Sequence, residues 1–542
     1  MEQLSLMYPA GKTPNTITLS EETCNDLSLD YIFNFLTTND DERRVIKRMT
    51  LELESDPEVI RYRCDVFEDI MRFPSLRKRM TEALDQLNYM KTLGSTFMDE
   101  TVAPLWQLIN RLRELEIYIN CITEIHKALG DTPVRSEGML RMKEYVSSIY
   151  NESGFEYLSE DINALLTETS EIQSITLGVN LDNMLRPIEV GIMSVNHKRF
   201  NHTGVLDKFI KFLPQIGAML DGRSVDSLTK IHSGGGTAED DPLMKNLCGT
   251  MTDMLGSTVK HLNSTLSRYV NISGYSLTRF IPEFLFYIRW ADFCAKIMNA
   301  GMPMTRPIIL DSECKSMNSR GIYNLKLAVN KLKGQEIDIV GNDFEFSREH
   351  GIYIMTGPNR GGKTTFTQVV GVIFLLAQHG IYVPAESLSL SPCDNILTHF
   401  PADENKTVNL GRLGEESKRI SEIFAAASDK SLLLFNESLS TTSFTEGLYI
   451  AKDVVRALRC LGARTIFNTH MHELAMGLGE MNAYEGDLKV ASLITGIHEG
   501  QRSYKVCIAP PEGVSYARDI AEKYGVSFEQ LQRSIFTQSA SA

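Results

Sequence analysis

A glycine-rich segment in the second half of the chain has the residue types and spacing of a phosphate-binding loop. Residues 351–365 read GIYIMTGPNRGGKTT, and the P-loop pattern G-x-x-x-x-G-K-[ST] is satisfied by Gly357, Gly362, Lys363 and Thr364. Glycines let backbone amides turn towards phosphates, and the N-terminus of a following helix adds partial positive charge. The lysine can reach the β- and γ-phosphates, and the threonine hydroxyl can hold Mg²⁺.

An apolar strand before this loop and a helical pattern after it favour a nucleotide site over a chance glycine-rich turn. We therefore predict that the segment binds ATP together with Mg²⁺. The residues predicted to contact the nucleotide here are Gly357, Pro358, Asn359, Gly361, Gly362, Lys363, Thr364 and Thr365.

An acidic residue at the end of a buried strand would complete such a site. Residues 431–437 read SLLLFNE. P-loop ATPases have an Asp-Glu pair at this place, in which the Asp helps to hold Mg²⁺ and the Glu polarises the attacking water. Here the first position is the neutral Asn436, and Glu437 is intact. We predict that Thr364 and Asn436 hold the metal weakly and that Glu437 is catalytic; the alternative is that the segment is only a core strand.

The elements around these motifs alternate between short apolar runs and helical patterns after residue 305. Strand-like runs occur at Ile352–Met355, Leu432–Phe435 and Thr465–Phe467. Buried strands that alternate with helices indicate an α/β layer with a mainly parallel sheet. The P-loop helix is predicted to begin near Lys363.

The first 300 residues have a different, mainly helical pattern. Apolar residues recur every three or four positions from Leu105 to Ile125, which indicates one long helix. Long helices are also predicted at Glu137–Tyr150 and Leu243–Tyr269. Two interruptions stand out: β-branched residues at 174–195 predict short strands, and the glycine-rich, acidic segment at 232–242 predicts an exposed flexible loop.

Composition limits the classes of function. The chain has 542 residues with 43% hydrophobic and 23% charged residues, which is ordinary for a globular protein. Its net charge of −14 excludes a general polyanion-binding protein, so any nucleic-acid contact needs a local basic surface. The nine scattered cysteines form no CxxC pair, and neither a zinc site nor a disulfide framework is predicted. Without a signal peptide or a run of about 20 apolar residues, the chain is predicted to be cytoplasmic, with no membrane contact.

The segment TGPNRGGKTT at 356–365 resembles the P-loop of the MutS-type DNA mismatch-repair ATPases, a branch of the ABC ATPase class. The Pro-Asn after the first glycine makes the resemblance more specific than a generic P-loop. Further positions agree with the family's spacing over residues 335–475. They are Asn342-Asp343, Tyr382-Val383-Pro384-Ala385, Ile396, Thr398, Glu415, Thr442-Ser443, Gly447, Thr469-His470 and Glu473-Leu474.

This resemblance implies an α + α/β fold: an all-helical lever and clamp region followed by an ABC-class P-loop ATPase domain with a mainly parallel sheet. It implies a homodimer, in which Thr442 and Ser443 of the signature loop complete the nucleotide site of the other subunit. It also implies that His470 senses the γ-phosphate and that the clamp helices cross DNA. The predicted domains are 1–110 (first lever and core part), 111–270 (clamp-like region with short strands), 271–305 (returning lever helix) and 306–542 (ATPase).

The sequence departs from the family pattern in ways that bear on activity. Fewer than about 30 residues precede the first lever-like segment, so we expect no mismatch-reading domain, and we expect no C-terminal nuclease domain. Leu439-Ser440-Thr441 stands where the family has Gly-Arg-Gly. Because glycines give a loop freedom near phosphate, their loss, together with Asn436, predicts slow hydrolysis.

DNA contact is predicted from the resemblance, and the basic residues are its candidate surface. For each of them the alternative is a solvated helix face. Contacts with duplex or branched DNA would be made to the backbone and would depend strongly on salt. The candidates are His197, Lys198, Arg199, His202, Lys208 and Lys211, with further clusters at Arg43-Arg44-Lys47-Arg48 and Arg77-Lys78-Arg79.

Two alternatives to a DNA-binding ATPase stay open at this point. The acidic charge and sparse basic clusters are compatible with an ABC-type mechanical ATPase that acts on a protein or ribonucleoprotein. The neutral Asn436 is compatible with a nucleotide-gated scaffold that binds ATP and hardly hydrolyses it.

Overall fold

The computed structural model divides the protein into two compact units. One contains residues 1–77, 134–142 and 282–542, and the other contains residues 78–133 and 143–281. Three helices, α5 (Pro74–Phe97), α7 (Glu137–Tyr150) and α13 (Ile281–Asn299), contain residues of both units. The structure describes residues 4–97, 104–184, 187–199, 255–272, 274–358, 360–401, 412–439, 443–498, 501–511 and 524–539, and the structural statements below concern these residues.

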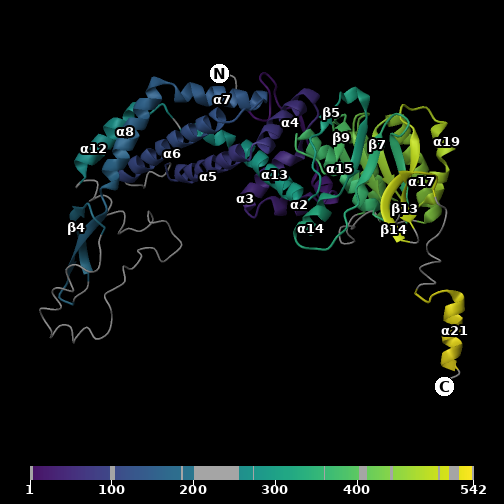
Figure 1. Cartoon of the computed structure of the whole chain (residues 1–542). Helices are drawn as coiled ribbons and strands as arrows, with labels where there is room; N and C mark the ends of the chain where they lie inside the picture. The colour runs from purple at the N-terminus through teal and green to yellow at the C-terminus, as the bar shows by residue number, and fades with distance from the viewer. Residues whose placement is uncertain are drawn as a thin grey trace. The chain divides into compact units, whose positions relative to one another are not determined.

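The centre of the first unit is a six-stranded sheet with the order β10-β11-β12-β8-β13-β14. Figure 1 labels β13 and β14 of this sheet. Neighbouring strands from β10 to β13 are parallel, and only the β13–β14 pair is antiparallel. This confirms the mainly parallel sheet predicted from sequence. The strands are β8 (Ile352–Thr356), β10 (Ile396–His399), β11 (Leu432–Asn436), β12 (Arg464–Asn468), β13 (Val490–His498) and β14 (Gln501–Ile508).

Helices cover both faces of this sheet. Helix α15 (Lys363–Gln378) is buried along most of its length, as expected for a helix that is apolar on nearly all sides. It approaches the sheet at Gly371, where a Cβ atom would lie 2.8 Å from the Leu434 side chain. On the opposite face of the sheet, Leu433 and Phe435 belong to one core cluster with residues of α16 (Arg412–Ala426) and α17 (Phe444–Leu461). The short helices α18 (His472–Met476) and α19 (Leu478–Asn482) follow β12.

A second sheet has four strands in the order β5-β9-β6-β7. Three of them, β5, β6 and β7, precede the P-loop strand β8 in sequence, and β9 follows it. It is antiparallel at β6–β7 and β6–β9 and parallel at β5–β9. Helix α14 (Leu325–Leu332) follows β6 and is capped by the Asn324 side chain. The strands are β5 (Ile308–Ile309), β6 (Met317–Ile322), β7 (Asn342–Phe346) and β9 (Ser387–Leu390), with a 3-10 turn η4 (Ser312–Cys314).

N-terminal helices pack directly on the sheet layer of the same unit. Gly380, just after α15, has φ +74°, and a Cβ atom there would lie 2.5 Å from the backbone of Arg63. The buried Arg63 guanidinium donates to the carbonyls of Met7 and Gln378 at 3.1 and 3.3 Å. The elements are β1 (Thr16–Thr18), α1 (Glu21–Asp26), α2 (Leu29–Leu36), α3 (Asp40–Leu51), β2 (Glu52–Glu54), α4 (Pro57–Arg72) and α13 (Ile281–Asn299), and α21 (Phe528–Ser539) lies near the C-terminus.

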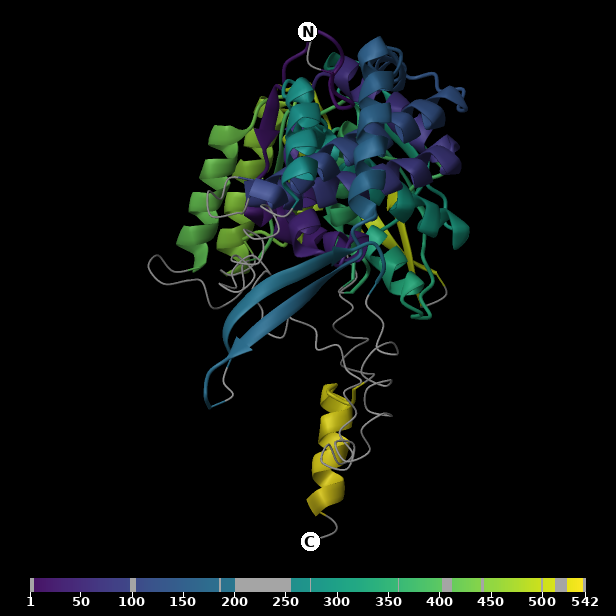
Figure 2. The ribbon, with the colours of Figure 1, turned by 90° about the vertical axis from the view of Figure 1, so that its left-hand side faces the viewer.

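The second unit is helical with one antiparallel strand pair. Strands β3 (Ser174–Leu181) and β4 (Pro187–Asn196) pair along their whole length and form a twisted ribbon (Figure 2). The helices are α6 (Pro104–Gly130), α8 (Ser153–Ser170) and α12 (Gly256–Leu266), with the 3-10 turns η2 (Ser267–Tyr269) and η3 (Gly274–Phe280). None of the helices in the described ranges is long and apolar enough to cross a membrane.

Most predicted elements are confirmed at the level of helix and strand. The helices at Leu105–Ile125 and Glu137–Tyr150 and the strands at 174–195 are present. The single helix predicted at Leu243–Tyr269 is wrong at its end, because the last turn, Ser267–Tyr269, is a 3-10 helix. Residues 243–254 and the loop predicted at 232–242 lie outside the described residues.

Candidate functional site

The P-loop has glycines at positions where a side chain would meet backbone strain or too little space. Gly357 has φ +140°, and a Cβ atom there would lie 2.1 Å from Thr495 Oγ1. At Gly361 a Cβ atom would lie 2.8 Å from the carbonyl of Pro358, and Gly362 has φ +91°. The loop thus presents bare backbone before α15 begins at Lys363, as phosphate binding requires. Asn359 lies outside the described residues.

The lysine of the loop is buried beside it. Its Nζ donates to the carbonyls of Gly357 and Pro358 at 3.1 and 3.3 Å. Burial lowers the pKa of Lys363, and the nearby carboxylate of Glu437 acts in the opposite direction. An ammonium held here over the loop is placed to meet phosphate oxygens.

A cavity of about 630 Å³ opens beside the loop, which is the size of a ligand pocket. Its lining combines residues 360–365 and Glu437 with apolar and aromatic residues and with the polar Asn324, Glu336, Asp338 and Asn342. Loop residues that can meet phosphates, together with apolar and aromatic residues that can contact a flat ring, suit a nucleotide-like ligand. The apolar and aromatic residues of the lining are Ile322, Tyr323, Leu327, Ile337, Ile339, Val340, Phe366, Val369 and Tyr504.

The two residues predicted to hold the metal are in direct contact. Thr364 Oγ1 donates to Asn436 Oδ1 at 2.9 Å. The same oxygen accepts from Asn468 Nδ2, because Asn436 and Asn468 are paired in the parallel register of β11 and β12. A hydroxyl and an amide oxygen fit Mg²⁺, which prefers oxygen ligands and usually keeps several waters and substrate phosphates in its coordination sphere. Neither residue adds negative charge.

The two predicted catalytic residues also lie together. His470 Nε2 and Glu437 Oε1 are 2.9 Å apart. The hydrogen bond from His470 is the main influence that holds the pKa of Glu437 below its ordinary value, and the charge of Lys363 acts in the same direction. Glu437 is therefore ionised at neutral pH, lines the cavity, and is available to polarise a water molecule.

The turn after β11 has a leucine in a backbone conformation that favours glycine. Leu439 has φ +63° and is fully buried. Its backbone amide donates to Glu416 Oε2 at 2.8 Å, and its side chain belongs to the core cluster under α17. Ser443 caps α17 by accepting from the amide of Glu446, whereas Thr442 lies outside the described residues.

Three contacts at the site were not predicted from sequence. Asn468 holds Asn436, Glu416 holds the Leu439 amide, and Ser438 is bonded to His399 on the neighbouring strand. The signal for Asn468 was present, since it directly precedes the Thr469-His470 motif. Without the order of strands in the sheet, however, its position opposite Asn436 could not be derived.

Many of the basic candidates for DNA contact are paired with acids. Each ion pair lowers the positive charge that the surface can offer to phosphates. His197, Lys198 and Arg199 are exposed after β4, whereas His202, Lys208 and Lys211 lie outside the described residues. The ion pairs are Arg43–Asp40, Arg44–Asp41, Lys47–Glu21, Lys47–Asp30, Arg77–Asp292, Lys78–Glu82 and Arg79–Asp131.

Two family models match this chain. The model of MutS domain V matches residues 353–506, and the model of the MutS2 N-terminal domain matches residues 55–299. Together they cover more than half of the 542 residues.

The chain is also similar to individual relatives over part of its length. The DNA mismatch repair protein MutS of Chlorobium chlorochromatii is 38% identical over 146 residues, which are 27% of this chain and 17% of that protein. The endonuclease MutS2 of Caldicellulosiruptor saccharolyticus is 31% identical over 233 residues, which are 43% of this chain and 27% of that protein. The endonuclease MutS2 of Brevibacillus brevis is 30% identical over 215 residues, or 39% and 26% of the two chains. The matched regions thus span 17–27% of these relatives.

Proposed function

We propose that this chain, which belongs to the MutS family of the mismatch-repair type, binds ATP with Mg²⁺, hydrolyses it slowly, and binds duplex or branched DNA without reading mismatched bases. The observation that carries the nucleotide part is the glycine cradle at 357–362, with Lys363, Thr364 and Glu437 around one cavity. We also propose that residues 111–270 form the clamp and that residues 306–542 form the ATPase domain.

In this proposal the loop backbone holds the phosphates, and apolar and aromatic residues of the cavity lining contact the base. Lys363 faces the β- and γ-phosphates. Mg²⁺, when bound, neutralises phosphate charge, and Thr364 and Asn436 would hold it.

Hydrolysis would depend on Glu437 and His470. The ionised Glu437 orients a water molecule that adds to the γ-phosphorus, and ADP leaves. His470 is bonded to the same carboxylate, so the surroundings of its imidazole ring change when the γ-phosphate leaves. In this way His470 transmits the presence or absence of the γ-phosphate to β12. Turnover is slow because Asn436 contributes no charge to the metal site.

The nucleotide site would be completed by a second copy of the chain. Ser443 lies at the N-terminus of α17, where the helix has partial positive charge. On the same helix Phe444 and Tyr449 are 51% and 70% exposed, which is typical of a surface that another protein covers. Thr442 and Ser443 would then contact the γ-phosphate bound by the other subunit of a homodimer.

DNA would be bound by backbone and shape contacts. The exposed His197, Lys198 and Arg199 follow the β3–β4 ribbon and offer positive charge there. With an overall charge of −14, only such a local surface can attract phosphates. Binding should therefore weaken steeply as salt is raised.

One experiment tests the parts of the proposal separately. The affinity for a fluorescent ATP analogue, the rate of ATP hydrolysis and the oligomeric state are measured with duplex, junction and single-stranded DNA. Retention of each DNA is measured in a gel-shift assay at low and at high salt. Lys363→Ala should abolish nucleotide binding, while the surface control Lys418→Ala should not. Absence of nucleotide binding by the wild type would overturn the ATP part, and absence of DNA retention at low salt would overturn the DNA part.

A second candidate is an ATPase that acts on a protein or ribonucleoprotein. The observation in its favour is that the basic clusters on α3 and α5 are largely paired with carboxylates. A protein partner that stays bound after nuclease treatment, without any DNA retention at low salt, would select this candidate.

A further inference from the structure

The turn that carries Glu437 has an unusual backbone. Glu437 and Leu439 have φ values of +52° and +63°, in the left-handed region that residues with a side chain rarely adopt. Ser438 lies between them. Such a conformation persists only where surrounding contacts fix it, so the contacts of this turn determine where the Glu437 carboxylate points.

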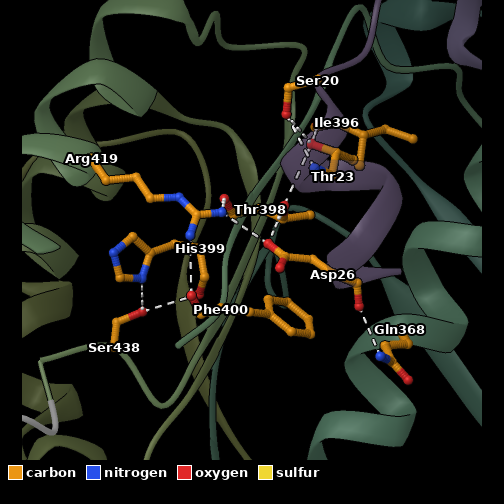
Figure 3. Close-up of polar contacts among 10 residues, drawn as sticks. All are labelled: Ser20, Thr23, Asp26, Gln368, Ile396, Thr398, His399, Phe400, Arg419 and Ser438. Atoms are coloured by element: carbon orange, nitrogen blue, oxygen red, sulfur yellow. Dashed lines mark hydrogen bonds and ion pairs between the residues drawn. The ribbon is translucent and has the colours of Figure 1, made fainter. Parts of the chain in front are cut away.

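Four hydrogen bonds fix the turn: one at Glu437, one at Leu439 and two at Ser438. The amide of Glu437 donates to the carbonyl of Asn468 at 2.8 Å, and the amide of Leu439 donates to Glu416 Oε2 at 2.8 Å. Between them Ser438 Oγ lies 2.6 Å from His399 Nδ1 and 3.3 Å from the His399 carbonyl. Figure 3 shows the hydroxyl turned towards the imidazole ring at the end of β10.

The imidazole can satisfy this hydroxyl without carrying charge. Burial lowers the pKa of His399 to about 4, with the charge of Arg419 acting in the same direction, so the ring is neutral at pH 7. With its proton on Nδ1, the ring donates to Ser438 Oγ, and the hydroxyl donates on to the His399 carbonyl. Both side chains are buried, with 2% exposure each, so water does not compete for these bonds.

His399 is held in place by its own strand and by a neighbouring helix. Thr398 donates to Asp26 Oδ2 at 2.7 Å, and the Arg419 guanidinium joins Asp26 to the carbonyls of Thr398 and Phe400 (Figure 3). The His399 ring also packs against Phe435 of β11, with 6.1 Å between ring centroids. The histidine is therefore a rigid support for the turn.

We propose that His399 and Ser438 are positioning residues for Glu437: their hydrogen bond fixes the left-handed turn after β11 and so directs the Glu437 carboxylate into the cavity. This inference rests on the proposed ATP hydrolysis. The described residues that line the cavity include Glu437 and do not include His399 or Ser438. The pair therefore acts through Glu437 and not on the nucleotide.

A positioning role predicts a specific kinetic signature. Ser438→Ala and His399→Leu should lower kcat about tenfold, since a displacement of about 1 Å in a catalytic group can cost up to 100-fold. The Kd for the fluorescent ATP analogue should stay within about twofold, because the P-loop is untouched. His399→Asn, which keeps an N–H near the Nδ1 position, should recover part of the lost kcat. The double variant should be no slower than either single variant, because both remove one interaction.

A matched control is Ser319→Ala. Its buried hydroxyl donates to the Phe344 carbonyl at 2.7 Å in the second sheet, so the change removes a bond of the same kind away from the turn. It should leave kcat unchanged. An unchanged kcat in Ser438→Ala and His399→Leu, or a loss of nucleotide affinity as large as the loss of kcat, would overturn the proposal.

A second measurement does not require turnover. Hydrogen exchange of the 437 and 439 amides should become faster in Ser438→Ala, with no change in β8 at 352–356. Unchanged exchange at these amides would overturn the positioning role. A wild type that binds ATP and does not hydrolyse it would instead contradict the proposed hydrolysis, and the exchange result would still decide whether the pair fixes the turn.

Discussion

Asn436→Asp restores the charge that P-loop ATPases have beside the metal. The asparagine is 5% exposed, and its Oδ1 already accepts from Thr364 Oγ1 and Asn468 Nδ2. An aspartate has nearly the same shape, keeps the accepting oxygen, and replaces the amide nitrogen by a second oxygen. The substitution therefore changes the charge of the site and little of its geometry.

The size of the effect follows from the strength of charged hydrogen bonds. A hydrogen bond to a charged group contributes about 1.5–3 kcal/mol, compared with about 0.5–1.5 kcal/mol for a neutral one. The gain of roughly 1–2 kcal/mol in the metal-bound state corresponds to about 5- to 30-fold at 1.36 kcal/mol per factor of ten. Burial of the carboxylate opposes part of this gain by raising its pKa. We expect the Mg²⁺ concentration for half-maximal hydrolysis to fall and kcat to rise by about tenfold.

The assay is a titration of ATP hydrolysis with Mg²⁺ at pH 7.5 and saturating ATP. Asn39→Asp is the control, because it adds the same charge at the exposed N-cap of α3, where a carboxylate is well tolerated. It should change neither quantity. The reasoning is refuted if wild-type hydrolysis is already fast and Asn436→Asp leaves it unchanged, or if the variant binds Mg²⁺ more weakly.

Three further changes probe the fold around the site. Gly380→Ala should lower the free energy of unfolding by about 2 kcal/mol or more, because it combines a left-handed backbone with contact against the Arg63 backbone; a melting temperature equal to the wild type would contradict this. Leu439→Gly should also destabilise, by about 1–3 kcal/mol in chemical denaturation, since the loss of a buried leucine exceeds the relief of its backbone. The pKa of Glu437 is lowered in the folded state, so its stabilisation is complete above its ordinary pKa and is lost as the pH falls through the lowered value. The difference in melting temperature between wild type and Glu437→Gln should therefore stay constant from pH 7 down to the ordinary glutamate pKa of 4.5 and shrink below it. A difference that stays constant below pH 4.5 would count against the pairing with His470.

The parts of the site that follow one another in sequence could be predicted. The P-loop is a local motif, in which β8, the glycines and the start of α15 are contiguous, so their geometry follows from residue types alone. The same holds for Asn436 and Glu437 at the end of β11. Helical periodicity likewise located α6 and α7 within a few residues.

Contacts between distant segments could not be predicted in the same way. Asn436 meets Asn468 because β11 and β12 are neighbours, and His399 meets Ser438 because β10 lies on the other side of β11. Periodicity identifies strands and leaves their order open. The packing of the N-terminal helices against α15 through Gly380 and Arg63 depends on the same missing information, and the 3-10 turn at Ser267–Tyr269 depends on packing that a helical pattern does not encode.

The two positions at which the sequence is predicted to depart from the family pattern affect the site differently. At position 439 the left-handed backbone costs about 1–2 kcal/mol for a residue with a side chain, and full burial of a leucine returns about 1.5–3 kcal/mol. Leu439 can therefore keep the shape of the turn that a glycine would adopt, and its amide is fixed by Glu416. At position 436 no comparable substitute exists, because the contacts of Asn436 are made by the neutral Thr364 and Asn468. Slow hydrolysis would therefore result more directly from the absence of a negative charge at position 436, beside the metal site, than from the shape of the turn at position 439.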